Sequence, residues 1–232
     1  MKISTAGESH GKGLFGMIEG LPAGLKIDTD EIDGYLALRQ SGYGRGARQK
    51  IEHDRVEILS GVRDRVTLGS PVTLAVWNRD YENWKFCMAP EGCDTSARTL
   101  TKVRPGHADL TGLKKFGGTD ARNILERASA RETAVRVAAG TVCRQLLRAL
   151  GVEVSGYVRS VGNVSDEGEY TFDALSGRLG ELFMMDAGKQ AEAMRLIDAC
   201  REAGDTCGGV AELRVRGLKS GFGSCMTYPE KL

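Results

Sequence analysis

One strongly periodic segment, which starts at Ser129 and stops at Gly151, sets the first limit on the fold. Ser129 and Glu132 have capping-box spacing, and apolar residues then recur at helical spacing up to the glycine. A β-rich run at 152–161, an amphipathic helical pattern at 187–203 and an alternating run at 210–215 follow. This β–α–β order does not fix the direction of strand pairing. We predict an α+β fold with mostly antiparallel sheet.

The first third of the chain adds more of both elements. Residues 14–19 predict a strand that ends at a Gly-Leu-Pro turn, and Asp28 with Glu31 predicts the start of a helix that runs to about Arg39. The runs at 55–62 and 72–77 predict two further strands, with a Gly-Ser-Pro turn between them.

Composition excludes several classes of function. The chain has 232 residues and a net charge of +1, which argues against a nucleic-acid partner or a membrane surface, and it has no long apolar run. The six cysteines form no CxxC pair, and no cysteine–histidine spacing matches a metal site. With no secretory signal at the N-terminus, we expect reduced thiols and a cytoplasmic location.

Cations gather in two parts of the sequence. Residues 98–148 hold eleven basic and four acidic residues. Arg39, Arg45, Arg48 and Lys50 occupy a glycine-rich loop, and guanidinium groups bind carboxylates and phosphates bidentately. A solvated basic loop is the alternative. A nucleic-acid contact is disfavoured because the segment has one tyrosine and no repeat, and because acidic residues follow it.

Two of the three histidines lie in glycine-flanked turns. His10 stands in Gly-Glu-Ser-His-Gly, and His107 follows Arg104-Pro-Gly on a stiff turn. Both are candidate acid–base groups. For His10, the alternative is a loop histidine with no role. His53 lies in a strand-like run, and we interpret it as structural.

The start of the long helix is a candidate anion site. Free backbone N–H groups and the helix dipole favour an anion there, and Arg127 and Arg131 flank Ser129. Since cations are disfavoured at a helix start, we expect something negative to compensate them. A simple capped helix is the alternative. From the residues alone, the chain is an enzyme or binding protein for a phosphorylated, carboxylated small molecule.

Five segments carry a resemblance to a known family. They resemble chorismate synthase blocks in the family's order, closely over residues 3–161: GESHGKGLFGMIEGLPAG, RQSGYGRGARQKIEHDRVEILSGVR, TLGSPVTLAVWNRDYENW, RPGHADLTGLKKFG and ERASARETAVRVAAG. The resemblance implies a helical core between mostly antiparallel β-sheets, with residues 1–232 forming a single domain that is incomplete at its C-terminus. It also implies a homotetramer when full length.

The resemblance implies a lyase of the shikimate pathway, which serves aromatic amino-acid biosynthesis. The reaction is the 1,4-anti-elimination of phosphate from 5-enolpyruvylshikimate 3-phosphate, a phosphorylated dicarboxylate, to give chorismate. It requires reduced FMN, and NADPH is a candidate reductant. The alternative is an inactive chain that binds only anionic ligands or a partner.

The resemblance also implies roles for individual residues. His10 and His107 are the catalytic acids, on the phosphate side and the flavin side respectively. Substrate contacts are implied at Arg39, Arg45, Arg48, Arg104, Ser129 and Arg131. FMN contacts are implied at Arg127, Ala128, Ser129 and His107, and NADP contacts at Arg39 and Arg45. No metal ligand is implied.

Overall fold

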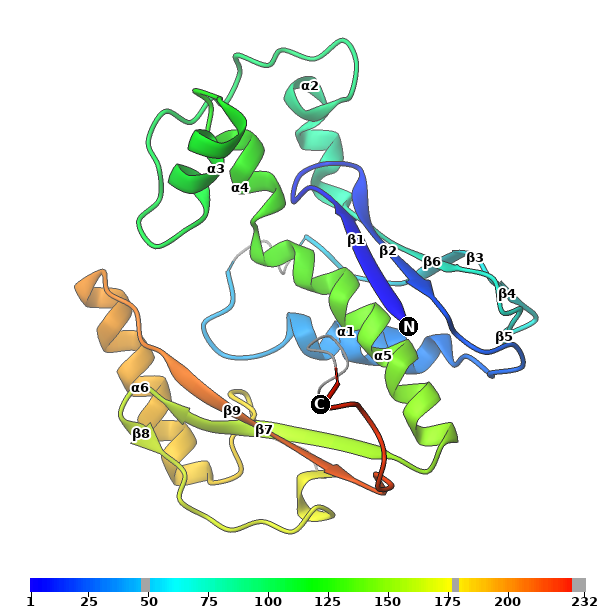
Figure 1. The fold of residues 1–232 in the computed structure, drawn as a ribbon. Coiled ribbons are helices and arrows are strands. Elements are labelled where there is room, and N and C mark those ends of the chain that lie inside the picture. The colour runs from blue at the N-terminus through cyan, green and yellow to red at the C-terminus, as the bar shows by residue number, and fades with distance from the viewer. Residues whose placement is uncertain (47–50, 177–179, 227–232) are drawn as a thin grey trace. The chain divides into compact units, whose positions relative to one another are not determined.

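The computed structural model describes residues 1–46, 51–176 and 180–226 (Figure 1). The chain divides into two compact units, one formed by residues 1–40 and 46–143 and the other by residues 41–45 and 144–232. Arg48 lies outside the described residues.

The first unit is built on an antiparallel sheet with helices around it. Its sheet has the order β1-β2-β6-β3, and a separate two-stranded ribbon pairs β4 with β5. The elements are β1 (Lys2–Gly7), β2 (Gly13–Glu19), α1 (Thr29–Gln40), β3 (Glu57–Ser60), β4 (Val62–Arg63), β5 (Val66–Thr67), β6 (Val72–Trp77), the 3-10 helix η2 (Arg79–Asn83), α2 (Lys85–Met88), α3 (Asp109–Phe116), α4 (Arg122–Arg127), the 3-10 helix η3 (Ala130–Glu132) and α5 (Thr133–Ala149), whose last turns belong to the second unit.

The core of this unit lies between the sheet and helices α1 and α5. Its fully buried side chains come from β2, β6, α1 and α5: Leu14, Ile18, Leu74, Val76, Ile32, Leu36, Val135 and Val142. Gly16 lets α5 approach β2 closely, because a Cβ there would lie 2.9 Å from Val135 Cγ2. This contact fixes the start of α5, and therefore the residues just before it, against the sheet.

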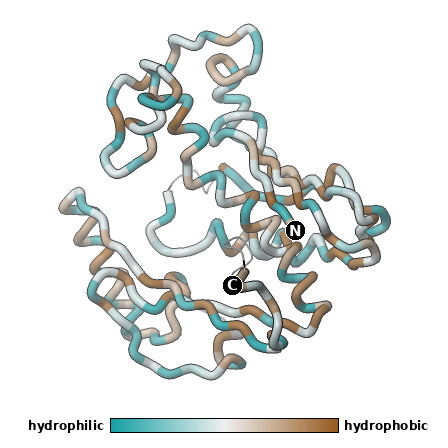
Figure 2. Tube along the Cα trace, in the orientation of Figure 1, coloured by the Kyte–Doolittle hydropathy of each residue, from teal (hydrophilic) through white to brown (hydrophobic). Residues whose placement is uncertain are grey.

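The second unit is a three-stranded antiparallel sheet with one long helix. The sheet order is β8-β7-β9, and hydrophobic and hydrophilic residues alternate along β9 (Figure 2). The elements are β7 (Glu153–Val161), β8 (Val164–Ser165), the 3-10 helix η4 (Ala174–Ser176), α6 (Ala187–Ala203) and β9 (Gly209–Arg216). Val164, Met184 and Ala193 form its buried centre.

The structure confirms the predicted α+β class with antiparallel sheets. The helix at 187–203 and the strand at 72–77 have the predicted bounds, and α5 starts at Thr133 after one 3-10 turn capped by Ser129. The strand predicted at 55–62 is wrong in extent: β3 covers only Glu57–Ser60, and His53 is an exposed residue in irregular structure. No helix among the described residues is long and apolar enough to cross a membrane.

Candidate functional site

The turn that carries His10 is held in one shape by its neighbours. Gly7 has φ +103°, and a Cβ there would lie 2.3 Å from the carbonyl oxygen of Gly13, so only glycine fits this end of β1. The Asn78 side-chain amide donates to the carbonyls of Glu8 (3.0 Å) and Gly11 (2.8 Å). The turn therefore presents His10 from a rigid frame anchored to the end of β6.

His10 is bound to a buried carboxylate that sequence reasoning did not single out. Its Nδ1 lies 2.9 Å from both carboxylate oxygens of Glu126, and its backbone N–H donates to Glu126 Oε2 at 2.8 Å. Glu126 is 1% exposed and also accepts from Arg122 Nη1 at 3.3 Å. Burial alone raises the pKa of Glu126, but the hydrogen bonds from His10 and Arg122 outweigh it and the pKa is lowered. Glu126 is therefore an anion at neutral pH.

An aromatic ring and a second carboxylate complete the surroundings of His10. The imidazole stacks on Trp84 with ring centroids 3.8 Å apart, and Arg98 Cζ lies 3.7 Å from the centroid of the same indole. Trp84 Nε1 donates to Asp80 Oδ2 at 3.2 Å, and that oxygen lies 3.9 Å from His10 Nε2. The imidazole is thus fixed in plane and in position.

Arg131 lies beside this turn in a second cluster, where it is almost fully buried. Its Nη1 donates to Asp54 Oδ2 at 2.6 Å and its Nε to Asn78 Oδ1 at 2.9 Å, while Nη2 lies 3.7 Å from Glu52 Oε2. Carboxylates of the protein itself therefore compensate this cation. We expected an unspecified anion at the helix start, and Asp54 and Glu52, which are distant in sequence, supply the negative charge.

Arg39 joins the same cluster from the end of α1. Its Nη1 lies 3.4 Å from Asp54 Oδ2, its Nε donates to Thr133 Oγ1 at 2.9 Å, and its Nη2 donates to the Ala130 carbonyl at 3.0 Å. The side chain is only 11% exposed, so it is not a solvated loop cation. Asp54 thus binds two of the arginines that the sequence predicted to contact anions.

Arg127 and Ser129 contact the turn and strand β1. Arg127 Nη2 donates to the carbonyl (3.0 Å) and hydroxyl (2.8 Å) of Thr5 and lies 3.6 Å from Glu132. Ser129 caps η3 by accepting from the Arg131 backbone N–H, and its hydroxyl donates to Ser9 Oγ at 3.2 Å. Glu132 binds Thr5 and Arg136 instead of closing a capping box.

Arg104 and His107 lie at the start of α3. Asp109 is fully buried and accepts from the Arg104 backbone and guanidinium, each at 2.9 Å, and these bonds lower the pKa of Asp109 to about 2 despite its burial. His107 is exposed on the turn that this pair fixes. The stiff turn predicted from Pro105-Gly106 is present, and Gly106 has φ +70°.

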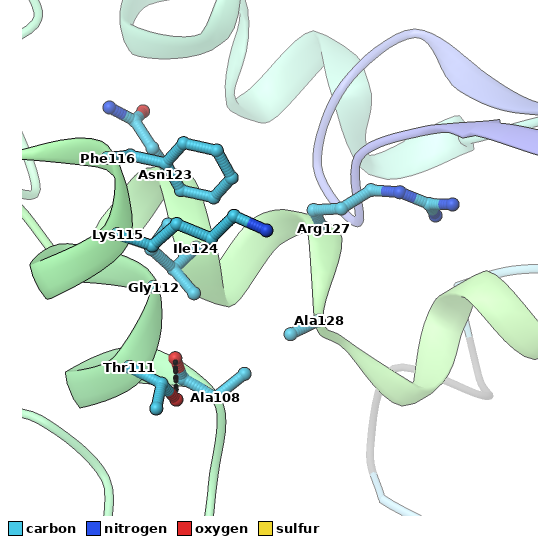
Figure 3. A pocket seen from close by; sticks show the side chains of 9 residues that line it. All are labelled: Ala108, Thr111, Gly112, Lys115, Phe116, Asn123, Ile124, Arg127 and Ala128. Carbon is cyan, nitrogen blue, oxygen red and sulfur yellow. Dashed lines mark hydrogen bonds between the residues drawn. The ribbon is translucent and has the colours of Figure 1, made fainter.

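A cavity of about 510 Å³ lies between α3 and α4 (Figure 3). Its lining is mostly apolar: Ala108, Thr111, Gly112, Lys115, Phe116, Asn123, Ile124, Arg127 and Ala128. Figure 3 shows the Arg127 guanidinium turned away from the space, which agrees with its bonds to Thr5. Helix α4 thus lines the cavity with Asn123, Ile124 and the part of Arg127 nearest its backbone, and it presents Glu126 to His10.

Arg45 belongs to the second unit. It is exposed, and its Nε donates to the Ser41 carbonyl at 3.0 Å. The first unit brings together His10, Arg39, Arg131 and Ser129 among the predicted residues, and the partners that sequence reasoning missed are Glu126, Asp54, Glu52, Asn78 and Trp84. One local signal existed, because Arg122 and Glu126 have the i,i+4 spacing of a helical ion pair.

Fold and site together define an α+β protein in which buried carboxylates hold a histidine and several arginines beside an antiparallel sheet. Comparison with known proteins gives the family. The family model for chorismate synthase matches residues 1–232, and this chain belongs to the chorismate synthase family.

The relatives agree with this assignment. A protein named chorismate synthase from Desulforudis audaxviator is 50% identical over 236 residues, covering 100% of this chain and 60% of its own length. One of the same name from Trichlorobacter lovleyi is 52% identical, with the same coverage. A solved structure titled "Crystal Structure of Chorismate Synthase" matches 99% of this chain and 62% of its own chain, with a TM-score of 0.76 and 36% identity. The chain spans about 60% of the length of the curated relatives that it matches.

Proposed function

We propose that the protein to which this chain belongs is a chorismate synthase. It would eliminate phosphate from 5-enolpyruvylshikimate 3-phosphate in a 1,4-anti sense and so act as a carbon–oxygen lyase of the shikimate pathway. The observation that carries the proposal is the fixed His10 beside the Arg39–Arg131 cluster, in a chain that belongs to this family. A proton donor next to guanidinium groups suits the departure of a phosphate dianion.

The chain's own residues would have distinct tasks. Arg39 and Arg131, with Arg104, Arg45 and Arg48, would hold the carboxylates and the phosphate of the substrate. Ser129 would contact the substrate as well, because its hydroxyl donates to Ser9, the residue next to His10 in the same turn. His10 would give a proton to the leaving phosphate, and His107 would serve the flavin side.

The cavity between α3 and α4 fits a flat cofactor in size and lining. Cavities of several hundred Å³ with apolar walls and few polar groups are typical of cofactor sites. Arg127 and Ala128 line it, Ser129 follows them in the chain, and His107 directly precedes the lining residue Ala108. We assign these four residues to FMN. When bound, reduced flavin would lend an electron transiently to the substrate, with no net redox change.

Several further features stay proposals. NADPH would be the reductant, with Arg39 and Arg45 as its contacts. Residues 1–232 would belong to one domain, which in the relatives is completed by the part that this chain does not span. The assembly would be a homotetramer in the cytoplasm.

The test is an anaerobic assay of the natural gene product with 5-enolpyruvylshikimate 3-phosphate and photoreduced FMN. We expect equal yields of phosphate and chorismate, none with oxidised FMN, and a strong loss in His10→Ala. Phosphate release that needs no reduced flavin would overturn the proposal, and so would full activity in His10→Ala. Binding of FMN without turnover would favour the alternative of an inactive, anion-binding chain. Adding NADPH with oxidised FMN tests the reductant.

A further inference from the structure

Several residues contact His10, and most of the hydrogen bonds that hold it and its turn come from one residue of α4, Glu126. Glu126 accepts from the imidazole Nδ1 (2.9 Å) and from the His10 backbone N–H (2.8 Å), and its own carbonyl accepts from the Ser9 backbone N–H (2.9 Å). A single residue 116 positions away therefore fixes both the backbone and the ring of His10.

The ionisation of Glu126 determines which imidazole nitrogen carries a hydrogen. A carboxylate only accepts hydrogen bonds, so the nitrogen 2.9 Å from both of its oxygens has to be the donor. Nδ1 therefore keeps its hydrogen whether His10 is neutral or cationic, and Nε2 is the nitrogen whose proton is exchanged.

The other contacts aim the ring. Stacking on Trp84 sets its plane, and the Trp84 indole is itself tied to Asp80, whose carboxylate lies on the Nε2 side at 3.9 Å. Arg122 binds the Glu126 carboxylate at 3.3 Å and keeps it from rotating away from His10.

We propose that Glu126 is the positioning residue of His10: it fixes the Nδ1–H form of the imidazole and directs proton transfer through Nε2. Only one part of this proposal rests on the proposed function: that the group which accepts the proton from Nε2 is the leaving phosphate. The arrangement is that of a carboxylate–histidine pair, in which the carboxylate sets the tautomer and takes no proton itself.

The first test is a spectrum that needs no activity. The chain has three histidines, so ¹⁵N-histidine labelling gives three imidazole patterns, which His10→Gln and His53→Gln assign. For neutral His10 we expect a protonated Nδ1 in the wild type and in Glu126→Asp, which keeps the charge. In Glu126→Gln we expect a shift toward protonated Nε2.

A matched control removes a different buried carboxylate. Asp166 is 2% exposed, lies in the second unit and accepts from Tyr170 and from the Gly168 and Asp186 backbones. Asp166→Asn should leave the His10 pattern unchanged even if it destabilises the chain. A protonated Nε2 in wild-type His10, or an unchanged pattern in Glu126→Gln, would overturn the proposal.

The second test is kinetic and uses the natural gene product. Glu126→Gln should lower kcat roughly 10²–10⁴-fold with little change in KM, the range for loss or misorientation of an acid–base group. Glu126→Asp should recover part of it. Unchanged kcat in Glu126→Gln would overturn the positioning role while leaving the proposed function intact. A wild type that forms no chorismate yet gives the predicted spectra would refute the proposed function and support the positioning of His10.

Discussion

Replacing Asp54 by asparagine should cost this chain a large part of its folding stability. The Asp54 carboxylate is fully buried and accepts from Arg131 at 2.6 Å, and the Arg131 side chain is 5% exposed. Removing one partner of a buried ion pair leaves an uncompensated charge and costs about 3–5 kcal/mol. Within the described part of the chain, Asp54 Oδ1 makes no hydrogen bond that the substitution would remove. Glu52 also stays 3.7 Å from Arg131 and still compensates part of its charge, so we expect the lower end of this range, about 3 kcal/mol.

The assay is urea unfolding of the purified chain, followed by circular dichroism, with the free energy of unfolding extrapolated to water. The matched control is Glu153→Gln, which breaks the exposed pair between Glu153 and Arg216 and should leave the free energy of unfolding nearly unchanged, because water screens exposed pairs. The double variant Asp54→Asn/Arg131→Met should recover much of the loss, because it removes the stranded cation as well. A loss below about 1 kcal/mol in Asp54→Asn would refute the view that this carboxylate compensates a buried arginine.

Three further predictions concern other parts of the first unit. The pKa of Asp109 is lowered from 3.8 to about 2 in the folded chain, so its contribution to stability is present above about pH 4 and lost as the pH falls toward 2; acid unfolding of Asp109→Asn should lack that part of the pH dependence. Gly16→Val should destabilise the chain by about 1–3 kcal/mol in thermal unfolding, because its Cβ would press on Val135. Gly34→Ala in α1 should be neutral or stabilising, because outside its own helix backbone the new Cβ would have no described atom within 4 Å. His107→Ala should lower turnover roughly 10²–10⁴-fold without lowering the melting temperature, since the side chain is exposed; wild-type turnover in that variant would contradict its assignment.

The elements that sequence predicted well are those with strong periodicity. Helices α5 and α6 each carry one apolar face. Strand β6 is a mostly apolar run in which Val72, Leu74, Ala75 and Val76 are buried. Strand β1 gave no such signal, because it is an edge strand whose residues are mostly exposed and small or polar. The short helices α2, α3 and α4 were also missed, since each has too few residues to show a helical period.

The sequence drew attention to His10 and to the arginines that the fold brings together, but not to the carboxylates that bind them. An arginine or a histidine between glycines is visible locally, whereas the role of a carboxylate depends on what the fold places beside it. Asp54 lies 77 residues from Arg131, and Glu126 lies 116 from His10. In the sequence both acids look like ordinary neutralising charges.

The charge count of residues 98–148 explains why the missing partners had to come from elsewhere. The segment has four acids for eleven bases, and the structure engages all four acids: Asp109 with Arg104, Asp120 with the backbones of Leu100 and Arg122, Glu126 with His10 and Arg122, and Glu132 with Thr5, Arg127 and Arg136. Because none of these four is bound to Arg131 among the described contacts, burying that cation requires carboxylates from outside the segment. Glu52 and Asp54 supply these carboxylates. Burial alternates along this extended segment, so both acids are buried while His53 between them is exposed. A local excess of positive charge therefore predicts an acidic partner from a distant part of the chain as readily as it predicts an anionic ligand. The same arginines can have both, because those that Asp54 orients are also the ones proposed to bind the substrate.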